Sequence, residues 1–281
     1  MSLFAIRTSP VNSPITMLEE RIENLNDPRL EVYRSLKTTN TTRDARLFIA
    51  EGPTVVERVL RSGFDVRSIL ISDRKWNSFG ARLPDNVPVY RLSQPLAEEL
   101  VGFAFHCGVM ACASRRPASP IGSALPARGP ALLVAGDRIT DPENVGALIR
   151  IASAFGATGV LLGPGSADPF SRRVLRVSMG NGLFLPIEET NDLAAQLIQL
   201  RDFHGCHIAG TLLDPTATPL AGFTFPERTV IVFGNEYDGI SPAIRSCLQT
   251  ALTIPMHNGT DSLNVAISAG IFLNQYRTQR G

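Results

Sequence analysis

The sequence is poor in lysine, and it lacks the long hydrophobic runs of a membrane protein. Lys37 and Lys75 are its only lysines, so arginine supplies nearly all of its 27 basic side chains. No apolar stretch reaches the roughly 18 residues that a membrane-spanning helix needs. The opening segment MSLFAIRTSPVNSPIT has neither the apolar core nor the cleavage pattern of a secretory signal. These absences predict a cytoplasmic protein with no membrane partner.

Cysteine is also scarce. The four cysteines are Cys107, Cys112, Cys206 and Cys247, and none forms a Cys-x-x-Cys pair. The spacing of His106, Cys107 and Cys112 matches no structural zinc pattern. We therefore expect buried free thiols and no metal site.

The net charge is close to zero. It is +1 over 281 residues, which by itself indicates no polyanionic partner. The balance differs between the two parts of the chain, with 16 basic against 13 acidic side chains up to residue 120 and 11 against 13 after it. A polyanion would therefore bind mainly to the first part.

The composition of one segment predicts two domains. In residues 117–130, PASPIGSALPARGP, 11 of 14 residues are Pro, Gly, Ala or Ser, which is typical of a linker. Residues 1–17 are predicted to be a flexible tail. Residues 18–116 read as a small α/β domain. In residues 131–281, strands alternate with helices, which predicts a parallel sheet covered on both faces.

The patterns place individual elements as well. Strands are predicted over 66–71, 87–92, 106–112, 131–135, 158–162, 207–213, 229–233 and 252–254. Helices are predicted over 54–60, 94–100, 192–203 and 262–276, with others ending at 155 and beginning after 171 and 241.

The usual nucleotide-binding signatures are missing. No G-x-G-x-x-G follows a predicted strand, and GPGSADP at 163–169 lacks the Lys-Ser/Thr ending of a P-loop. This argues against an enzyme that uses a dinucleotide cofactor. Parallel α/β sheets bind ligands at the carboxyl ends of their strands, so the loops after the strands are the places to examine.

The first such loop leads into an amphipathic helix. Apolar residues recur every three or four positions from Val145 to Phe155, and Arg150 lies off this stripe. Side chains on helices lean toward the preceding turn, so we expect Arg150 to reach over the bare Gly146 toward Asn144. There it could hold a phosphate or a ribose, although a plain surface arginine fits the same pattern.

Two further loops carry polar residues. Gly234 and Glu236 follow a buried strand, and the glycine indicates either close approach to a ligand or a tight turn. Ser262 and Asn264 stand at the start of a helix that is apolar or small almost all round from 265 to 273. Such a helix lies either in a deep core or at a subunit interface.

Together, three segments resemble motifs one, two and three of the SpoU (TrmH-type) family of SPOUT RNA 2′-O-methyltransferases. They are DPENVGALIRIASAFGATGV, IVFGNEYDGIS and IPMHNGTDSLNVAISAGI. The intervening DPFSRRVLRVSMGNGLFLPI fits the family as well. Residues 18–116 resemble a ribosomal-protein-like substrate-binding domain through RLFIAEGPTVVERVL and FHCGVMACASRRP.

The resemblance implies a fold, a reaction and partners. It implies a parallel-sheet domain tied in a trefoil knot, a homodimer, and S-adenosylmethionine as cofactor. The implied reaction is methyl transfer to a ribose 2′-hydroxyl. The expected substrate is rRNA, and tRNA is the second choice. A non-catalytic RNA-binding or ribosome-assembly protein on the same fold is the alternative.

The resemblance also implies roles for individual residues. Arg150 would orient the 2′-hydroxyl and stabilise its developing alkoxide, Asn144 and Asn264 would position the ribose and the arginine, and Glu236 would hold the loop or the substrate. The residues implied to enclose the cofactor are Leu212, Leu213, Gly234, Asn235, Glu236, Ile254, Met256, Ser262, Leu263 and Asn264. The candidate RNA contacts are Arg172, Arg173 and Arg176, which crowd one side of a short helix, and Arg43, Arg46, Arg115 and Arg116.

Overall fold

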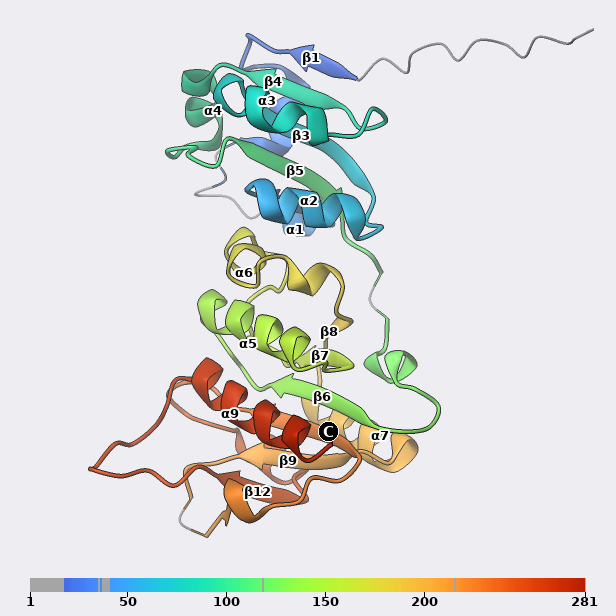
Figure 1. Cartoon of the computed structure of the whole chain (residues 1–281), viewed down its shortest axis with the longest axis vertical. Helices are drawn as coiled ribbons and strands as arrows, with labels where there is room; N and C mark the ends of the chain where they lie inside the picture. The colour runs from blue at the N-terminus through green and yellow to red at the C-terminus, as the bar shows by residue number, and fades with distance from the viewer. Residues whose placement is uncertain (1–17, 35, 37–40, 118, 215, 281) are drawn as a thin grey trace, which may run out of the picture.

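The computed structural model describes residues 18–34, 36, 41–117, 119–214 and 216–280. The tail predicted over 1–17 lies outside these residues. In the described part, no helix has both the length and the apolar character to cross a membrane. The described chain forms two β-sheets, one from each half of the sequence, with helix α6 between them (Figure 1).

The N-terminal sheet has five strands in the order β1-β4-β3-β5-β2. Its strands are β1 (Glu19–Arg21), β2 (Leu47–Glu51), β3 (Val66–Ser72), β4 (Val89–Leu92) and β5 (Val109–Ser114). The accompanying helices are α1 (Thr41–Asp44), α2 (Pro53–Arg61), α3 (Asp73–Phe79) and α4 (Gln94–Val101). Strand β5 runs antiparallel to both of its neighbours, whereas the other pairs are parallel.

The C-terminal sheet has seven strands in the order β10-β12-β9-β11-β6-β7-β8, and every pair is parallel, as predicted. Its strands are β6 (Ala131–Gly136), β7 (Gly159–Leu162), β8 (Ile187–Glu189), β9 (His207–Thr211), β10 (Thr218–Pro219), β11 (Arg228–Phe233) and β12 (Thr250–Thr253). Its helices are α5 (Pro142–Ala154), α6 (Arg172–Val177), α7 (Leu193–His204), α8 (Pro242–Arg245) and α9 (Val265–Thr278).

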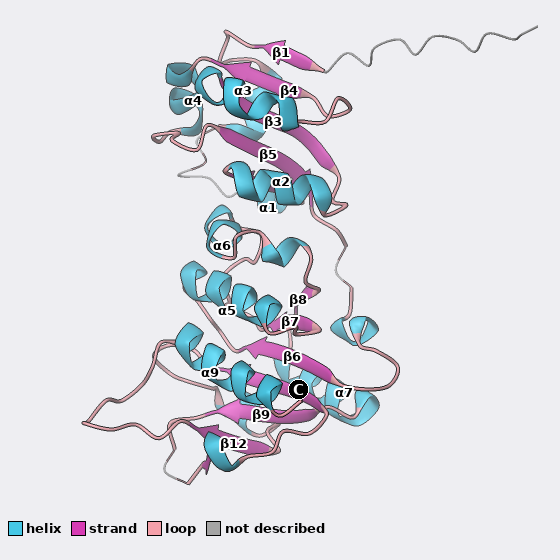
Figure 2. Ribbon diagram, viewed as in Figure 1, coloured by secondary structure: helices cyan, strands magenta, loops and turns pink. Residues whose placement is uncertain are grey.

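The continuous apolar strands explain why both faces of this sheet are covered. In β6, Leu132 and Val134 belong to one buried cluster together with residues of α5 and α9. Leu133 and Ala135 point to the opposite face and pack with residues of α7 and α8. Side chains alternate between faces along a strand, so an unbroken apolar run requires a layer of helices on each side (Figure 2).

Several predicted elements differ in detail from the observed ones. The strand predicted over 106–112 begins at Val109, because residues 106–107 lie in a turn. The short edge strand β1, Glu19–Arg21, was not predicted. All three of its residues are exposed, so it lacks the apolar alternation that identifies a strand.

The segment predicted as a linker, 117–130, is partly packed. It contains a 3-10 helix, Ile121–Ala124, and Ile121 is buried in the core beneath α7. The backbone N–H of Ile121 donates to the Glu188 carboxylate at 2.6 Å. Leu125 packs against the same core, and the Arg228 guanidinium donates to the carbonyls of Pro126 and Gly129 at 3.1 Å each. Several contacts therefore fix this stretch to the C-terminal sheet.

The four cysteines are free thiols, as predicted, and all but Cys107 are fully buried. Burial raises the pKa of Cys107 to about 11 and that of Cys112 to about 12, because a thiolate loses its hydration there. Both stay protonated at neutral pH.

Candidate active site

Residues from the three polar segments meet at the carboxyl ends of the central strands. The Asn144 side-chain amide donates to Glu236 Oε1 at 2.7 Å. The Asn264 amide donates to Asn144 Oδ1 at 2.9 Å. Asn144 thus bridges a residue that follows β11 and a residue that precedes α9, which lie 92 and 120 positions along the chain from it.

Helix starts hold both asparagines in place. Asp141 caps α5 by accepting from the Glu143 N–H at 2.8 Å, and Pro142 follows it at the first helical position. Asn144 therefore lies in the first turn, where only 8% of it is exposed. Asn264 is itself the cap of α9, since its side chain accepts from Ala266 N at 2.8 Å. Asn264 therefore caps α9 and also takes part in the hydrogen-bonded chain of side chains that runs through Asn144 to Glu236. We call this chain the polar chain.

The loop after β11 is a tight turn in which Gly234 is essential. A Cβ on Gly234 would lie 2.3 Å from the backbone of Gly239 and of Ile240. Within the turn, Asn235 Oδ1 accepts from the backbone N–H of Tyr237 at 2.9 Å. The structure therefore shows the tight turn, and Gly234 also lines the cavity described below, so the two interpretations of this glycine are compatible.

A second connection between the β6 and β11 loops was not expected from the sequence. The buried Asp137 carboxylate accepts from Ser241 N at 2.7 Å, and the Asn235 amide donates to the Arg138 carbonyl at 2.8 Å. Arg138 adopts a left-handed backbone with φ of 56° and pairs with Asp238 at 3.3 Å. The sequence signal that could have indicated this connection is the pair Asp137-Arg138 directly after a buried strand.

A cavity of about 470 Å³ opens beside this polar chain. All ten residues implied to enclose the cofactor line it, and they come from the ends of β9, β11 and β12 and from the loop before α9. Asp261 and Ser268 line it too, although the sequence had not singled them out as ligands. Among the described residues, no group of three His, Cys, Asp or Glu side chains is arranged to hold a metal ion.

This cavity fits S-adenosylmethionine in size and chemistry. Pockets for ligands of this size have volumes of roughly 300–1,000 Å³. Leu212 and Ile254 offer apolar walls for an adenine ring, and the Glu236 and Asp261 carboxylates offer negative charge for a cationic ligand. Turn backbone supplies further polar groups at the rim.

Arg150 lies on α5, six residues after Asn144, and its side chain is exposed. Within the described residues it has no ion pair or hydrogen bond. The expected open space over Gly146 is absent: a Cβ there would lie 2.7 Å from Val177 Cβ, because α6 packs directly on α5. The guanidinium is therefore free to meet a substrate from solvent, and it does not line the cavity.

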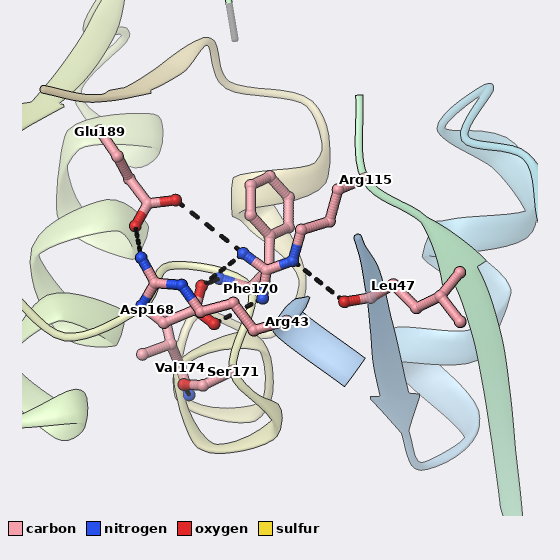
Figure 3. Close-up of polar contacts among 8 residues, drawn as sticks. All are labelled: Arg43, Leu47, Arg115, Asp168, Phe170, Ser171, Val174 and Glu189. Carbon is pink, nitrogen blue, oxygen red and sulfur yellow. Dashed lines mark hydrogen bonds and ion pairs between the residues drawn. The ribbon is translucent and has the colours of Figure 1, made fainter. Parts of the chain in front are cut away.

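Three of the seven arginines proposed for RNA contact line the boundary between the two sheets. Arg115 forms a two-point ion pair with Asp168, and Arg43 pairs with Glu189 at 2.9 Å (Figure 3). Arg172 donates to Glu51 at 2.8 Å. Each of these side chains already has a carboxylate partner from the other half of the chain.

The other four are more open to solvent. Arg46, Arg116, Arg173 and Arg176 are exposed. Arg116 lies over the Phe64 ring at 4.1 Å, Arg173 pairs with Glu143, and Arg176 is 3.7 Å from Glu51. Their contact with RNA stays a prediction.

Comparison with known proteins gives one consistent result. Residues 131–274 match the model of the SpoU rRNA Methylase family. Over 268 residues, the chain is 32% identical to an uncharacterized tRNA/rRNA methyltransferase of Mycobacterium tuberculosis, covering 91% of this chain and 90% of the relative. It is 28% identical to the 23S rRNA (guanosine(2553)-2′-O)-methyltransferase RlmP of Bacillus subtilis, covering 92% and 99%.

Solved structures agree with the sequence relatives. An rRNA methyltransferase from Sinorhizobium meliloti with bound AdoMet superposes with a TM-score of 0.80 at 25% identity. The alignment covers 93% of this chain and 98% of that one. The likeness therefore spans both sheets and not only the C-terminal one.

Proposed function

The chain belongs to the SpoU rRNA Methylase family, and we propose that it transfers a methyl group from S-adenosylmethionine to a ribose 2′-hydroxyl of ribosomal RNA, with Arg150 as the central catalytic residue. The observation that carries this proposal is the hydrogen-bonded chain from Glu236 through Asn144 to Asn264 beside the cavity. It brings the three motifs together and leaves the guanidinium of Arg150 without a protein partner in the described chain.

The cavity residues would hold the cofactor. S-adenosylmethionine supplies a methyl group on a positively charged sulfur, an electrophile that needs no further activation. Leu212, Ile254 and Met256 would form the apolar walls of its site. Glu236 and Asp261 would favour its positive charge, and the backbone of the Gly234 turn would give polar contacts.

Arg150 would act on the hydroxyl. A guanidinium keeps its protons in proteins, so Arg150 serves as a donor and not as a base. It orients the 2′-hydroxyl and stabilises the alkoxide that develops as the oxygen attacks the methyl carbon. The hydroxyl proton leaves to an acceptor on the RNA, such as the adjacent phosphate. Asn144 and Asn264 fix the start of α5 relative to the cofactor loops.

The remaining parts of the proposal concern assembly. Residues 18–116 would bind RNA, with Arg46 and Arg116 as phosphate contacts, and Arg173 and Arg176 would add contacts from α6. The C-terminal sheet would carry the trefoil knot that the family resemblance implies.

The test is methyl transfer from radiolabelled S-adenosylmethionine to purified rRNA. We expect Arg150→Ala to lower kcat about 100-fold or more, as loss of an oxyanion-stabilising donor does. Cofactor affinity measured by calorimetry should stay within about twofold, because Arg150 does not line the cavity.

Arg201→Ala is the matched control, since Arg201 on α7 is partly exposed and, within the described residues, its one ion pair is with its neighbour Asp202. It should transfer methyl groups at the wild-type rate. Failure of the wild-type protein to bind the cofactor would contradict the proposal, and so would an Arg150→Ala protein with normal kcat.

A further inference from the structure

The boundary between the two sheets contains a buried ion pair. Arg115 follows the last residue of β5, and Asp168 lies in the loop before α6. Nη1 and Nη2 of Arg115 donate to the two oxygens of Asp168 at 2.9 and 2.5 Å. The two side chains are only 12% and 6% exposed. Nε of Arg115 donates to the Leu47 carbonyl at 3.0 Å, so the arginine also binds the first residue of β2.

Groups of both signs surround this pair (Figure 3). The Arg115 guanidinium lies 5.4 Å from the centre of the Phe170 ring. Glu189 is 3.9 Å from Arg115 and 2.9 Å from Arg43. Burial raises the pKa of Glu189, and the charge of Asp168 adds to the effect. We call Arg43, Arg115, Asp168 and Glu189 the interdomain ion cluster. Its two cations and two anions balance.

Apolar packing and further polar contacts accompany the interdomain ion cluster. Leu175 and Leu183 of the C-terminal half are buried among apolar residues of the N-terminal half. Arg172 reaches across to Glu51, and Arg58 reaches back to Asn181 Oδ1 at 2.9 Å. The N-terminal unit therefore packs on α6 and is not held to the C-terminal half by the linker alone. We call this contact the α6 interface.

The α6 interface is connected to helix α5, which carries Arg150. Asp168 accepts from Phe170 N at 2.9 Å, and its carbonyl accepts from Ser171 N at 3.0 Å, which sets the start of α6. Helix α6 in turn packs on α5 at Gly146 without an intervening side chain. Helix α5 carries Arg150, so a continuous series of contacts joins the N-terminal unit to the helix that carries this arginine.

We propose that Arg115 and Asp168 are positioning residues for methyl transfer. Their ion pair fixes the N-terminal unit on α6, so that an RNA bound across both halves of one chain presents its target ribose to Arg150. The proposal rests on the function proposed above. It gives Arg115 a role different from the phosphate contact expected from the sequence. Removing one partner leaves a buried charge unpaired, which is far more damaging than removing both.

The effect of Asp168→Asn on RNA affinity distinguishes a phosphate-contact role of Arg115 from a domain-positioning role, because the two roles predict changes of opposite sign. If Arg115 contacted phosphate directly, removing the neighbouring negative charge would tighten RNA binding. If the pair positions the domain, Asp168→Asn weakens RNA binding as Arg115→Gln does. We expect each single variant to raise KM for rRNA about tenfold, with kcat and the cofactor Kd within about twofold of wild type.

Two further readouts support the distinction. Losing a phosphate contact would lower the salt dependence of RNA affinity by about one unit of slope, whereas losing a positioning contact leaves that slope unchanged. The exchanged double variant Arg115→Asp with Asp168→Arg restores the opposite charges and should recover part of the lost affinity. Asp202→Asn, in an exposed pair on α7, is the control and should behave as wild type.

Small-angle scattering of the protein without RNA tests the packing of the N-terminal unit on α6, and it does so independently of activity. We expect a larger radius of gyration for Asp168→Asn and a recovery toward wild type in the exchanged variant. An unchanged radius together with tighter RNA binding by Asp168→Asn would overturn the inference. Absence of methyl transfer by the wild-type protein would instead count against the proposed function, because the scattering result stands without it.

Discussion

At the scale of single residues, Asn144 makes the contacts that join the site. Its amide nitrogen donates to Glu236, and its amide oxygen accepts from Asn264. Only a side chain that both donates and accepts meets these two demands at one position. Glu236 needs a donor and Asn264 needs an acceptor at this position, and these two needs explain the asparagine without any role in RNA binding.

Asn144→Asp tests this requirement with almost no change of shape. The new carboxylate faces Glu236 at the place where a donor stood, so two like charges meet in a partly buried site. We expect the free energy of unfolding at neutral pH to fall by about 1–3 kcal/mol and methyl transfer to fall at least tenfold. Denaturant titration and the methyl-transfer assay measure the two effects.

Asn144→Ala is the comparison, because it removes both hydrogen bonds without adding charge. It should be less destabilising than Asn144→Asp. Equal stability of the Asp variant and the wild-type protein would show that Asn144 does not donate to Glu236 in solution.

Sequence reasoning predicted which residues the site contains better than it predicted what each one touches. Motif spacing placed Gly234 at a strand end, where the structure has it, and Ser262 at a helix start, whereas α9 begins at Val265 with Asn264 as its cap. Both Gly234 and Ser262 nevertheless line the same cavity. Motif spacing could not foresee that Val177 fills the space over Gly146, or that Arg115 pairs with Asp168. Periodicity fixes the face of a helix on which a residue lies, but partners from distant segments depend on tertiary packing.

At the scale of elements, the α5–α6 contact determines where the helix that carries Arg150 lies. Helix α5 was predictable because its apolar stripe, its Asp141 cap and its Pro142 all agree. The short helix α6 was predictable only from its Ser171 cap, and its position against α5 was not. Gly146 permits that contact, since any side chain at this position would meet Val177 and the Val174 carbonyl.

Gly146→Ala tests the contact. A Cβ at 2.7 Å from Val177 Cβ and 3.0 Å from the Val174 carbonyl forces the helices apart. We expect a loss of about 1–3 kcal/mol in the free energy of unfolding, which is typical of overpacking, and a fall in kcat, because α5 carries Arg150. Denaturant titration and steady-state kinetics follow the two effects.

Gly222→Ala is the matched control, because no atom lies within 4 Å of the Cβ that it adds. It should change stability by less than about 0.5 kcal/mol. A Gly146→Ala protein as stable as this control would mean that α6 does not pack on α5 as described.

At the scale of the whole molecule, helix α9 has two different faces. Ala269, Phe272 and Leu273 are buried against the sheet, whereas Ile267 and Ile271 are 57% and 40% exposed. The sequence left a deep core and a subunit interface as alternatives for this helix. The buried face is accounted for within one chain, and we propose that the exposed isoleucines contribute to the homodimer interface that the family resemblance implies.

Charge placed on this exposed face should prevent association. We expect Ile267→Arg with Ile271→Arg to halve the molar mass measured by analytical ultracentrifugation, because arginine is costly to bury in an apolar interface. The dissociated chain should keep the secondary structure of the wild-type protein by circular dichroism, since both side chains are exposed in the single chain. Ile198→Arg is the control: Ile198 on α7 is 39% exposed, and its substitution should leave the mass unchanged. A wild-type protein that sediments as a monomer would contradict the proposal.

The most direct measurement maps ribose 2′-O-methylation across total RNA from cells with and without this gene. The account predicts that deletion removes methylation at a defined ribose of rRNA. Wild-type protein supplied in trans should restore the methylation, and the Arg150→Ala protein should not. An rRNA methylation profile that is unchanged on deletion, or restored equally by Arg150→Ala, would contradict the account.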